Sequence, residues 1–105
     1  MKNERIKVTL YNMTTKEIDM TDFSVIPEDL FSNRDDIVSV ILPDGVEVIQ
    51  ANAFENCRRL EKVVFPSSLK KIETEAFRNC LSLKEINYKS DVEIAPDAFA
   101  GCINL

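Results

Sequence analysis

Three cysteines, Cys57, Cys80 and Cys102, carry the most versatile chemistry in this sequence, because a thiolate can act as a nucleophile or as a metal ligand. They lie 23 and 22 residues apart, so none of the short cysteine spacings of a zinc site is present. The sequence contains no histidine, the usual base for a nucleophilic thiol or hydroxyl. We therefore predict no catalytic residue, no metal site and no cofactor.

The charged residues also favour a non-catalytic protein. Carboxylates such as Asp35, Asp36, Glu73 and Glu75 fall in expected turns, and two glycines are too few for a phosphate-binding loop. With 13 basic and 18 acidic residues the net charge is −5, which disfavours a nucleic-acid or anionic membrane surface. A group of basic side chains is interleaved with glutamates, so we expect a solvated mixed face rather than a phosphate site. The basic group consists of Arg58, Arg59, Lys70, Lys71 and Arg78.

The elements that position these side chains follow from an internal repeat. The segment AFENCRRL at 53–60 returns as AFRNCLSL at 76–83 and as AFAGCINL at 98–105. Apolar stretches precede the blocks, VSVILP at 38–43, KVVFP at 62–66 and EINYK at 85–89. A spacing of 22 to 23 residues is typical of leucine-rich repeats, in which each unit buries its apolar face against the next.

An earlier, degenerate copy is also present. Shifting the first full copy back by 23 residues places apolar side chains in the same columns and Arg34 in the cysteine column. The apolar residues of this copy are Phe23, Ile26, Leu30, Phe31 and Ile37.

One unit reads as a short strand, a corner and a return. In LEKVVFP, the side chains of Leu60, Val63 and Phe65 are expected to point inward and those of Lys62 and Val64 outward. Proline ends the strand, and a helical or 3₁₀ turn at A-F-x-x-C is expected to turn phenylalanine and cysteine inward. Stacked units would form a solenoid with a short parallel sheet on its concave face. The stacked thiols would come within disulfide reach, but side chains that point the same way bridge poorly, so we expect buried free thiols.

The pattern L-x-x-[IV]-x-[FLY]-P-x-x-[LV]-x-x-I-x-x-x-A-F-x-x-C-x-x-L resembles the BspA-type (Treponema pallidum-type) leucine-rich repeat, well over residues 37–105 and weakly over 16–36. The resemblance implies a leucine-rich-repeat solenoid and a role in adhesion or protein recognition, mostly at bacterial or protist surfaces. The chain departs from the family where Gln50, Glu73 and Ala95 replace a usual glycine.

We expect a single domain with a strand-like cap at its N-terminal end. RIKVTLY at 5–11 alternates, the turn-prone NMTT follows, and KEIDM at 16–20 completes a β-hairpin. The last unit stops without a polar capping segment, so either the chain is continued or covered at that end, or its last coil frays. The expected parts of 1–105 are a cap at 1–15, a degenerate repeat at 16–36, and repeats at 37–60, 61–83 and 84–105.

The outward side of the strands is the predicted partner-binding surface. Ile41 and Val64 would form an exposed apolar strip, with Ile18 expected before them in the same column. The alternative is that β-branched residues simply suit strands, or that another copy covers the strip. The predicted site residues are Ser39, Ile41, Lys62, Val64, Glu85 and Asn87.

Three functions remain open at this point. The first is a non-catalytic module that binds a protein partner through the concave strand face. The second is a structural role, either as a self-assembling repeat protein that forms homo-oligomers through its last repeat or as a fragment of a bacterial surface adhesin. The third is a small acidic intracellular inhibitor. The start of the sequence has no apolar leader, which predicts a cytoplasmic location; a removed signal would place the protein at the cell surface or outside.

Overall fold

The computed structural model describes residues 5–20, 22 and 24–105, and all regular elements within them are β-strands. They form two four-stranded sheets, ordered β2-β1-β4-β6 and β3-β5-β7-β8. Among the described residues, no helix has the length and apolar character needed to cross a membrane. The strands are β1 (Arg5–Leu10), β2 (Thr15–Asp19), β3 (Val25–Ile26), β4 (Ile37–Ile41), β5 (Val48–Ile49), β6 (Lys62–Val64), β7 (Lys71–Ile72) and β8 (Glu93–Ile94).

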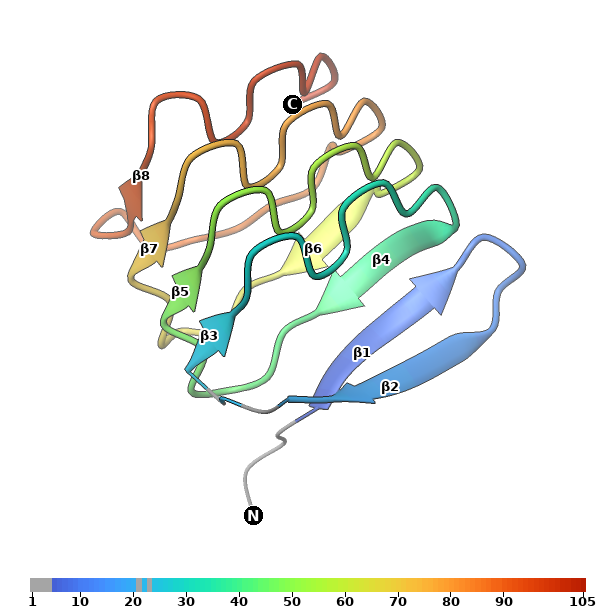
Figure 1. The fold of residues 1–105 in the computed structure, drawn as a ribbon, viewed down its shortest axis with the longest axis horizontal. Helices are drawn as coiled ribbons and strands as arrows, with labels where there is room; N and C mark the ends of the chain where they lie inside the picture. The colour runs from blue at the N-terminus through green and yellow to red at the C-terminus, as the bar shows by residue number, and fades with distance from the viewer. Residues whose placement is uncertain (1–4, 21, 23) are drawn as a thin grey trace.

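Equivalent positions of successive repeats pair with each other. In the second sheet all three pairings are parallel, and Ile26, Ile49, Ile72 and Ile94 follow one another across it. In the first sheet β4 and β6 are parallel, and a single bridge from Lys62 to Glu85 continues the ladder into the next repeat. The coils therefore stack one on another, from β3 at one end to β8 at the other (Figure 1). The repeat read from the sequence is thus the stacking unit of the fold.

The first two strands form an antiparallel hairpin at the N-terminal end of the stack (Figure 1). Alternation in β1 buries Ile6, Val8 and Leu10 against the core, and the same strand pairs antiparallel with β4. The expectation that Ile18 precedes Ile41 in the outward column is wrong, because Ile18 pairs with Ile6 inside the hairpin. The neighbour of Ile41 is Lys7 of β1. Residues 1–4 of the predicted cap and the predicted core residue Phe23 lie outside the described residues.

The turn at A-F-x-x-C differs from the expected helical or 3₁₀ turn. No helix of either kind occurs among the described residues, and the segment is a series of hydrogen-bonded turns. Asn52 and Asn56 both have left-handed backbones, with φ of 62° and 61°. A right-handed helix needs consecutive negative φ values, so two left-handed residues four apart interrupt it. Asparagine tolerates this conformation better than most residues do.

A ladder of phenylalanine rings forms the centre of the core. Phe31, Phe54, Phe77 and Phe99 stack in order, with centroid separations of 5.2, 4.9 and 5.2 Å. The first three rings are almost completely buried, and Phe99 is partly buried. Stacked pairs of this kind contribute roughly 0.5–1.5 kcal/mol beyond the burial of their area. The ladder links adjacent coils and explains why each repeat keeps its phenylalanine.

A second ladder, of asparagine side chains, runs through the turns. The Nδ2 of Asn56 donates to Oδ1 of Asn33 at 2.9 Å, and the Nδ2 of Asn79 donates to Oδ1 of Asn56 at 3.1 Å. Gly101 occupies the same column in the last repeat with φ of 80°. A Cβ at this glycine would collide with Oδ1 of Asn79, so both the backbone and the space favour glycine there.

Candidate functional site

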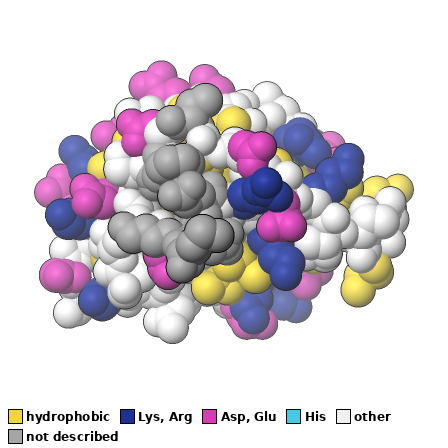
Figure 2. Space-filling model, turned by 90° about the horizontal axis from the view of Figure 1, so that it is seen from below, with side chains coloured by type: hydrophobic (Ala, Val, Ile, Leu, Met, Phe, Trp, Pro, Cys, Tyr) yellow, Lys and Arg dark blue, Asp and Glu magenta, His cyan; other side chains and the backbone are white. Residues whose placement is uncertain are grey.

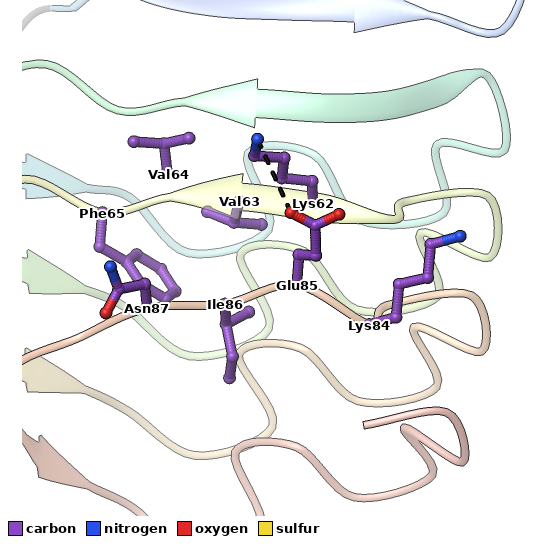
Figure 3. A pocket seen from close by; sticks show the side chains of 8 residues that line it. All are labelled: Lys62, Val63, Val64, Phe65, Lys84, Glu85, Ile86 and Asn87. Carbon is purple, nitrogen blue, oxygen red and sulfur yellow. Dashed lines mark ion pairs between the residues drawn. The ribbon is translucent and has the colours of Figure 1, made fainter.

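The predicted site residues share the outward face of the first sheet. The parallel register of β4 and β6 sets Ser39 beside Lys62 and Ile41 beside Val64. The bridge from Lys62 to Glu85 brings the third repeat alongside. Asn87 lies two residues beyond Glu85 and lines the same depression as Val64 (Figure 3). That these residues bind a partner stays a prediction.

Strand alternation leaves two apolar side chains on this face. Ile41 is 38% exposed and Val64 is 39% exposed, whereas their strand neighbours Val40 and Val63 are buried. Because Ile41 and Val64 are paired residues of adjacent strands, their side chains form one continuous apolar strip. We call these two residues the apolar strip.

A depression of about 490 Å³ lies beside the apolar strip, between β6 and residues 84–87 (Figure 3). Lys62 Nζ and Glu85 Oε2 are 3.7 Å apart at one end, and the side chains of Phe65 and Asn87 lie at the other. The depression therefore combines an apolar wall with an ion pair and an amide, and holds no arrangement of a nucleophile with a base. Its lining residues are Lys62, Val63, Val64, Phe65, Lys84, Glu85, Ile86 and Asn87.

The hairpin extends this face with residues that the sequence interpretation missed. Lys7 stands beside Ile41, and Glu17 of β2 stands beside Lys7, so charged side chains border the apolar strip on its N-terminal side. The neighbourhood of Lys7 and Ile41 joins residues 34 positions apart in antiparallel strands. Lys7 and Ile41 are not equivalent positions of two repeats, so the repeat spacing does not predict their contact.

The interleaved charges on the turn side are largely paired, as expected for a mixed face. Lys70 lies 3.7 Å from Glu47, Lys71 lies 3.8 Å from Glu93, and Arg78 lies 2.7 Å from Glu75. The N-terminal end of the molecule shows basic and acidic side chains interspersed without a broad area of one sign (Figure 2). Within the part of the chain that the structure describes, Arg58 and Arg59 form no ion pair.

All three cysteines are free, and two of them are completely buried. The prediction of buried free thiols is therefore confirmed for Cys57 and Cys80, while Cys102 is only partly buried. The thiols also have a role that the sequence did not indicate. The Sγ of Cys57 donates to the carbonyl of Phe31 at 3.1 Å, and Cys80 donates to Phe54 in the same way. These bonds tie each coil to the one before it.

The environment of Cys57 opposes nucleophilic chemistry. Burial raises the pKa of its thiol to about 12, because the thiolate would lose its hydration. At neutral pH the residue is a neutral thiol, and a thiol is a poor nucleophile. Among the described residues, no group of three His, Cys, Asp or Glu side chains is arranged to hold a metal ion.

The hairpin turn holds exposed side chains that the sequence analysis treated only as part of a cap. Tyr11 is 59% exposed and Met13 is 81% exposed, and the guanidinium of Arg59 lies 4.8 Å from the centre of the Tyr11 ring. The sequence does contain a signal for this exposed surface, because a tyrosine and a methionine are unusual in a turn that is otherwise polar.

Comparisons with known proteins agree with the architecture of the stack. No curated protein and no solved structure matches the chain significantly. One family model does match, over residues 7–105, and it is described as a BspA type leucine rich repeat region of six copies. The match begins at Lys7 in β1 and covers the rest of the hairpin and all of the stacked coils. The chain therefore belongs to the BspA-type leucine-rich repeat family.

Proposed function

We propose that this chain is a non-catalytic protein-binding module, a leucine-rich-repeat solenoid whose outward strand face docks a partner protein. The observation that carries the proposal is the apolar strip, in which Ile41 and Val64 stand side by side and more than a third exposed. Contiguous exposed apolar side chains rimmed by polar residues commonly mark protein interaction sites. Membership of a family whose repeats often serve protein binding or adhesion supports the same reading.

The strip is well prepared to bind. Ile41 and Val64 are β-branched and sit on hydrogen-bonded strands, so they lose little conformational freedom when a partner covers them. Covering a side chain of this size completely contributes about 1.5–3 kcal/mol. Both residues are already more than half buried, so their contribution lies at or below the lower end of that range. The strip therefore suits the centre of a modest interface rather than an entire binding site.

The polar groups around the strip supply the rim. Lys62 and Glu85 form an exposed cross-strand pair, and Lys7 and Asn87 stand on either side. An apolar centre within a polar rim is the usual anatomy of a protein interface. Rim charges govern the rate of association and the choice of partner more than they govern affinity. The partner that fits is a protein surface with an apolar centre and charges of both signs.

Charge-introducing substitutions test the proposal directly. The variants Ile41→Asp and Val64→Asp would be immobilised and compared with the unaltered chain for partners retained from a lysate of the source cells. The matched control is Leu81→Asp, since Leu81 is equally exposed at 38% but lies in a turn. We expect a partner that is lost with both strand variants and kept by the control. An identical set of retained proteins for all four chains would rule out the strand face.

A second candidate function is self-assembly through the last coil. The observation that favours it is the exposure of apolar side chains there, with Ile103 77% exposed and Leu105 51% exposed. Light scattering of the 105-residue chain over a range of concentrations would detect dimers or longer arrays. Loss of the assembly in Ile103→Asp would assign it to this coil, and a strict monomer at high concentration would remove the candidate.

A further inference from the structure

A β-bulge interrupts the pairing of the two inner strands of the first sheet, β1 and β4, beside the hairpin turn. The register between β1 and β4 pairs Thr9 with Ser39 but Leu10 with Ile37, so Val38 is an extra residue on β4. Bulges redirect side chains and are frequent next to functional sites. Here the redirected residue lines a surface depression of about 540 Å³. We call this depression the hairpin-turn groove; its lining residues are Tyr11, Met13, Val38, Arg59, Glu61 and Ser82.

The turn that overhangs the groove is held in place by its backbone. The amide of Tyr11 donates to the carbonyl of Asp36 at 2.8 Å, and the amide of Met13 donates to the carbonyl of Leu10 at 2.9 Å. The Oδ1 of Asn12 accepts bonds from the amide and the hydroxyl of Thr14. Tyr11 and Met13 are nevertheless among the most exposed apolar side chains of the described residues. A fixed backbone that presents large apolar groups to solvent has the form of a binding anchor.

The charge in the groove is unbalanced. Arg34, one coil below, donates to both carboxylate oxygens of Asp36 at 2.9 and 3.0 Å, so one edge of its guanidinium and its charge are paired. The guanidinium of Arg59 instead lies over the ring of Tyr11, and in the described part of the chain it pairs with no carboxylate. The acidic residue among the groove's lining residues, Glu61, is paired with Lys84 at 3.7 Å. The groove therefore presents a guanidinium that lies over an aromatic ring and has no ion-pair partner among the described residues.

We propose that the hairpin-turn groove binds an acidic peptide segment of a partner protein. An apolar side chain of the segment packs on Tyr11, Met13 and Val38, and a carboxylate next to it pairs with Arg59. Methionine adapts its shape to different apolar groups, and the planar guanidinium takes a carboxylate through two parallel hydrogen bonds. This surface uses none of the six residues predicted for the strand face, so it stands independently of the proposed function.

The net charge of −5 does not prevent such binding. Screening limits the repulsion between exposed charges to about 8 Å at physiological ionic strength, so the charges near the groove decide. Within the groove the charge without an ion-pair partner, as far as the described residues show, is that of Arg59. A basic segment would meet Arg59 and is disfavoured.

Nuclear magnetic resonance titration of the isotope-labelled chain at physiological ionic strength tests the proposal. The probe is the capped pentapeptide Asp-Glu-Leu-Asp-Glu, compared with Lys-Lys-Leu-Lys-Lys and with Asp-Glu-Gly-Asp-Glu. We expect the acidic leucine peptide to shift the amide signals of Tyr11, Met13, Val38 and Arg59, and both comparison peptides to bind more weakly. Arg59→Gln should weaken binding of the acidic peptide about tenfold, the loss of one good charge-assisted contact. The cationic control Lys70→Gln should bind the peptide unchanged.

Several results would overturn the proposal. These are an absence of shifts in the groove, equal binding of the lysine peptide, or undiminished binding by Arg59→Gln. Shifts centred on the apolar strip would assign the peptide to the strand face instead. Vesicles of phosphatidylcholine with phosphatidylglycerol provide the remaining comparison: if they broaden the groove signals while the acidic peptide has no effect, the groove faces a lipid surface.

Discussion

The asparagine ladder yields a sharp prediction because backbone and side-chain effects can be separated at one residue. Asn56 has φ of 61°, donates to Asn33 and accepts a bond from Asn79. Replacing it with alanine removes both side-chain bonds while keeping a Cβ in a left-handed backbone. Replacing it with glycine removes the same two bonds but relieves the backbone. In the same column, Gly101 already shows that glycine can adopt the left-handed backbone that this position requires.

The expected magnitudes follow from the geometry. Each lost hydrogen bond costs about 0.5–1.5 kcal/mol, with the lower half of that range appropriate here because Asn56 is only partly buried. A left-handed backbone costs a residue with a Cβ about 1–2 kcal/mol, and asparagine less than alanine. We expect Asn56→Ala to lower the free energy of unfolding by about 2–3 kcal/mol. Asn56→Gly should cost about 1 kcal/mol less than alanine, since its backbone gain is partly offset by the entropy of the unfolded glycine.

Urea unfolding followed by circular dichroism measures these differences, with the slope of the transition checked for each variant. The comparison position is Asn79, which has φ of 60° but makes only the bond that it donates to Asn56, so Asn79→Gly should cost less than Asn56→Gly by about one hydrogen bond. If Asn56→Ala were as stable as Asn56→Gly, the left-handed backbone would carry no strain and the reasoning would fail. If both variants were as stable as the unaltered chain, the ladder itself would contribute nothing.

Three further predictions follow from the core and the ion pairs. Phe77 stacks on two rings and makes an edge contact with Phe65, so Phe77→Ala should lower the free energy of unfolding by about 3–5 kcal/mol in urea titrations. Burial raises the pKa of Cys57 to about 12, so a thiol reagent applied at about pH 8 should modify the only partly buried Cys102 first and Cys57 only when the chain unfolds, as mass spectrometry of timed samples would show. The hydrogen bonds from Arg34 hold the pKa of Asp36 below its ordinary 3.8, so this pair stabilises the fold above that pH and the benefit is lost as the pH falls below it. Asp36→Asn should therefore reduce the difference in unfolding midpoint between neutral and acid solution, and an unchanged difference would contradict the assignment.

The stacked coils could be predicted from the sequence because every repeat must bury side chains at the same positions. A column that must face the core has to be apolar in each copy, so Phe31, Phe54, Phe77 and Phe99 reveal their role by spacing alone. The predicted outward residues could be placed on one face for the same reason, since strand alternation is a local property. The asparagine column was equally periodic in the sequence. It was overlooked because asparagines in turns are common and their bonds to the next coil cannot be read from spacing.

The turn geometry could not be predicted from composition, because two left-handed residues convert an apparent helical turn into a chain of separate turns. The position of the hairpin was also beyond the sequence. Residues 16–20 and β1 both have strand character, and which of them joins β4 depends on how well each buries its apolar side. Ile6, Val8 and Leu10 are buried in β1, whereas β2 has mainly exposed side chains.

What the sequence determined by itself is the set of columns that each coil repeats, and with it the family, the core and the outward strand face. The tertiary structure alone decided which distant segments meet where no repeat relates them. It set Lys7 beside Ile41 and brought Arg59 over Tyr11. The physical reason is that a periodic pattern encodes contacts between equivalent positions of neighbouring coils. Contacts between the hairpin and the stack have no period, and they form only where the packed surfaces and unpaired strand edges fit each other.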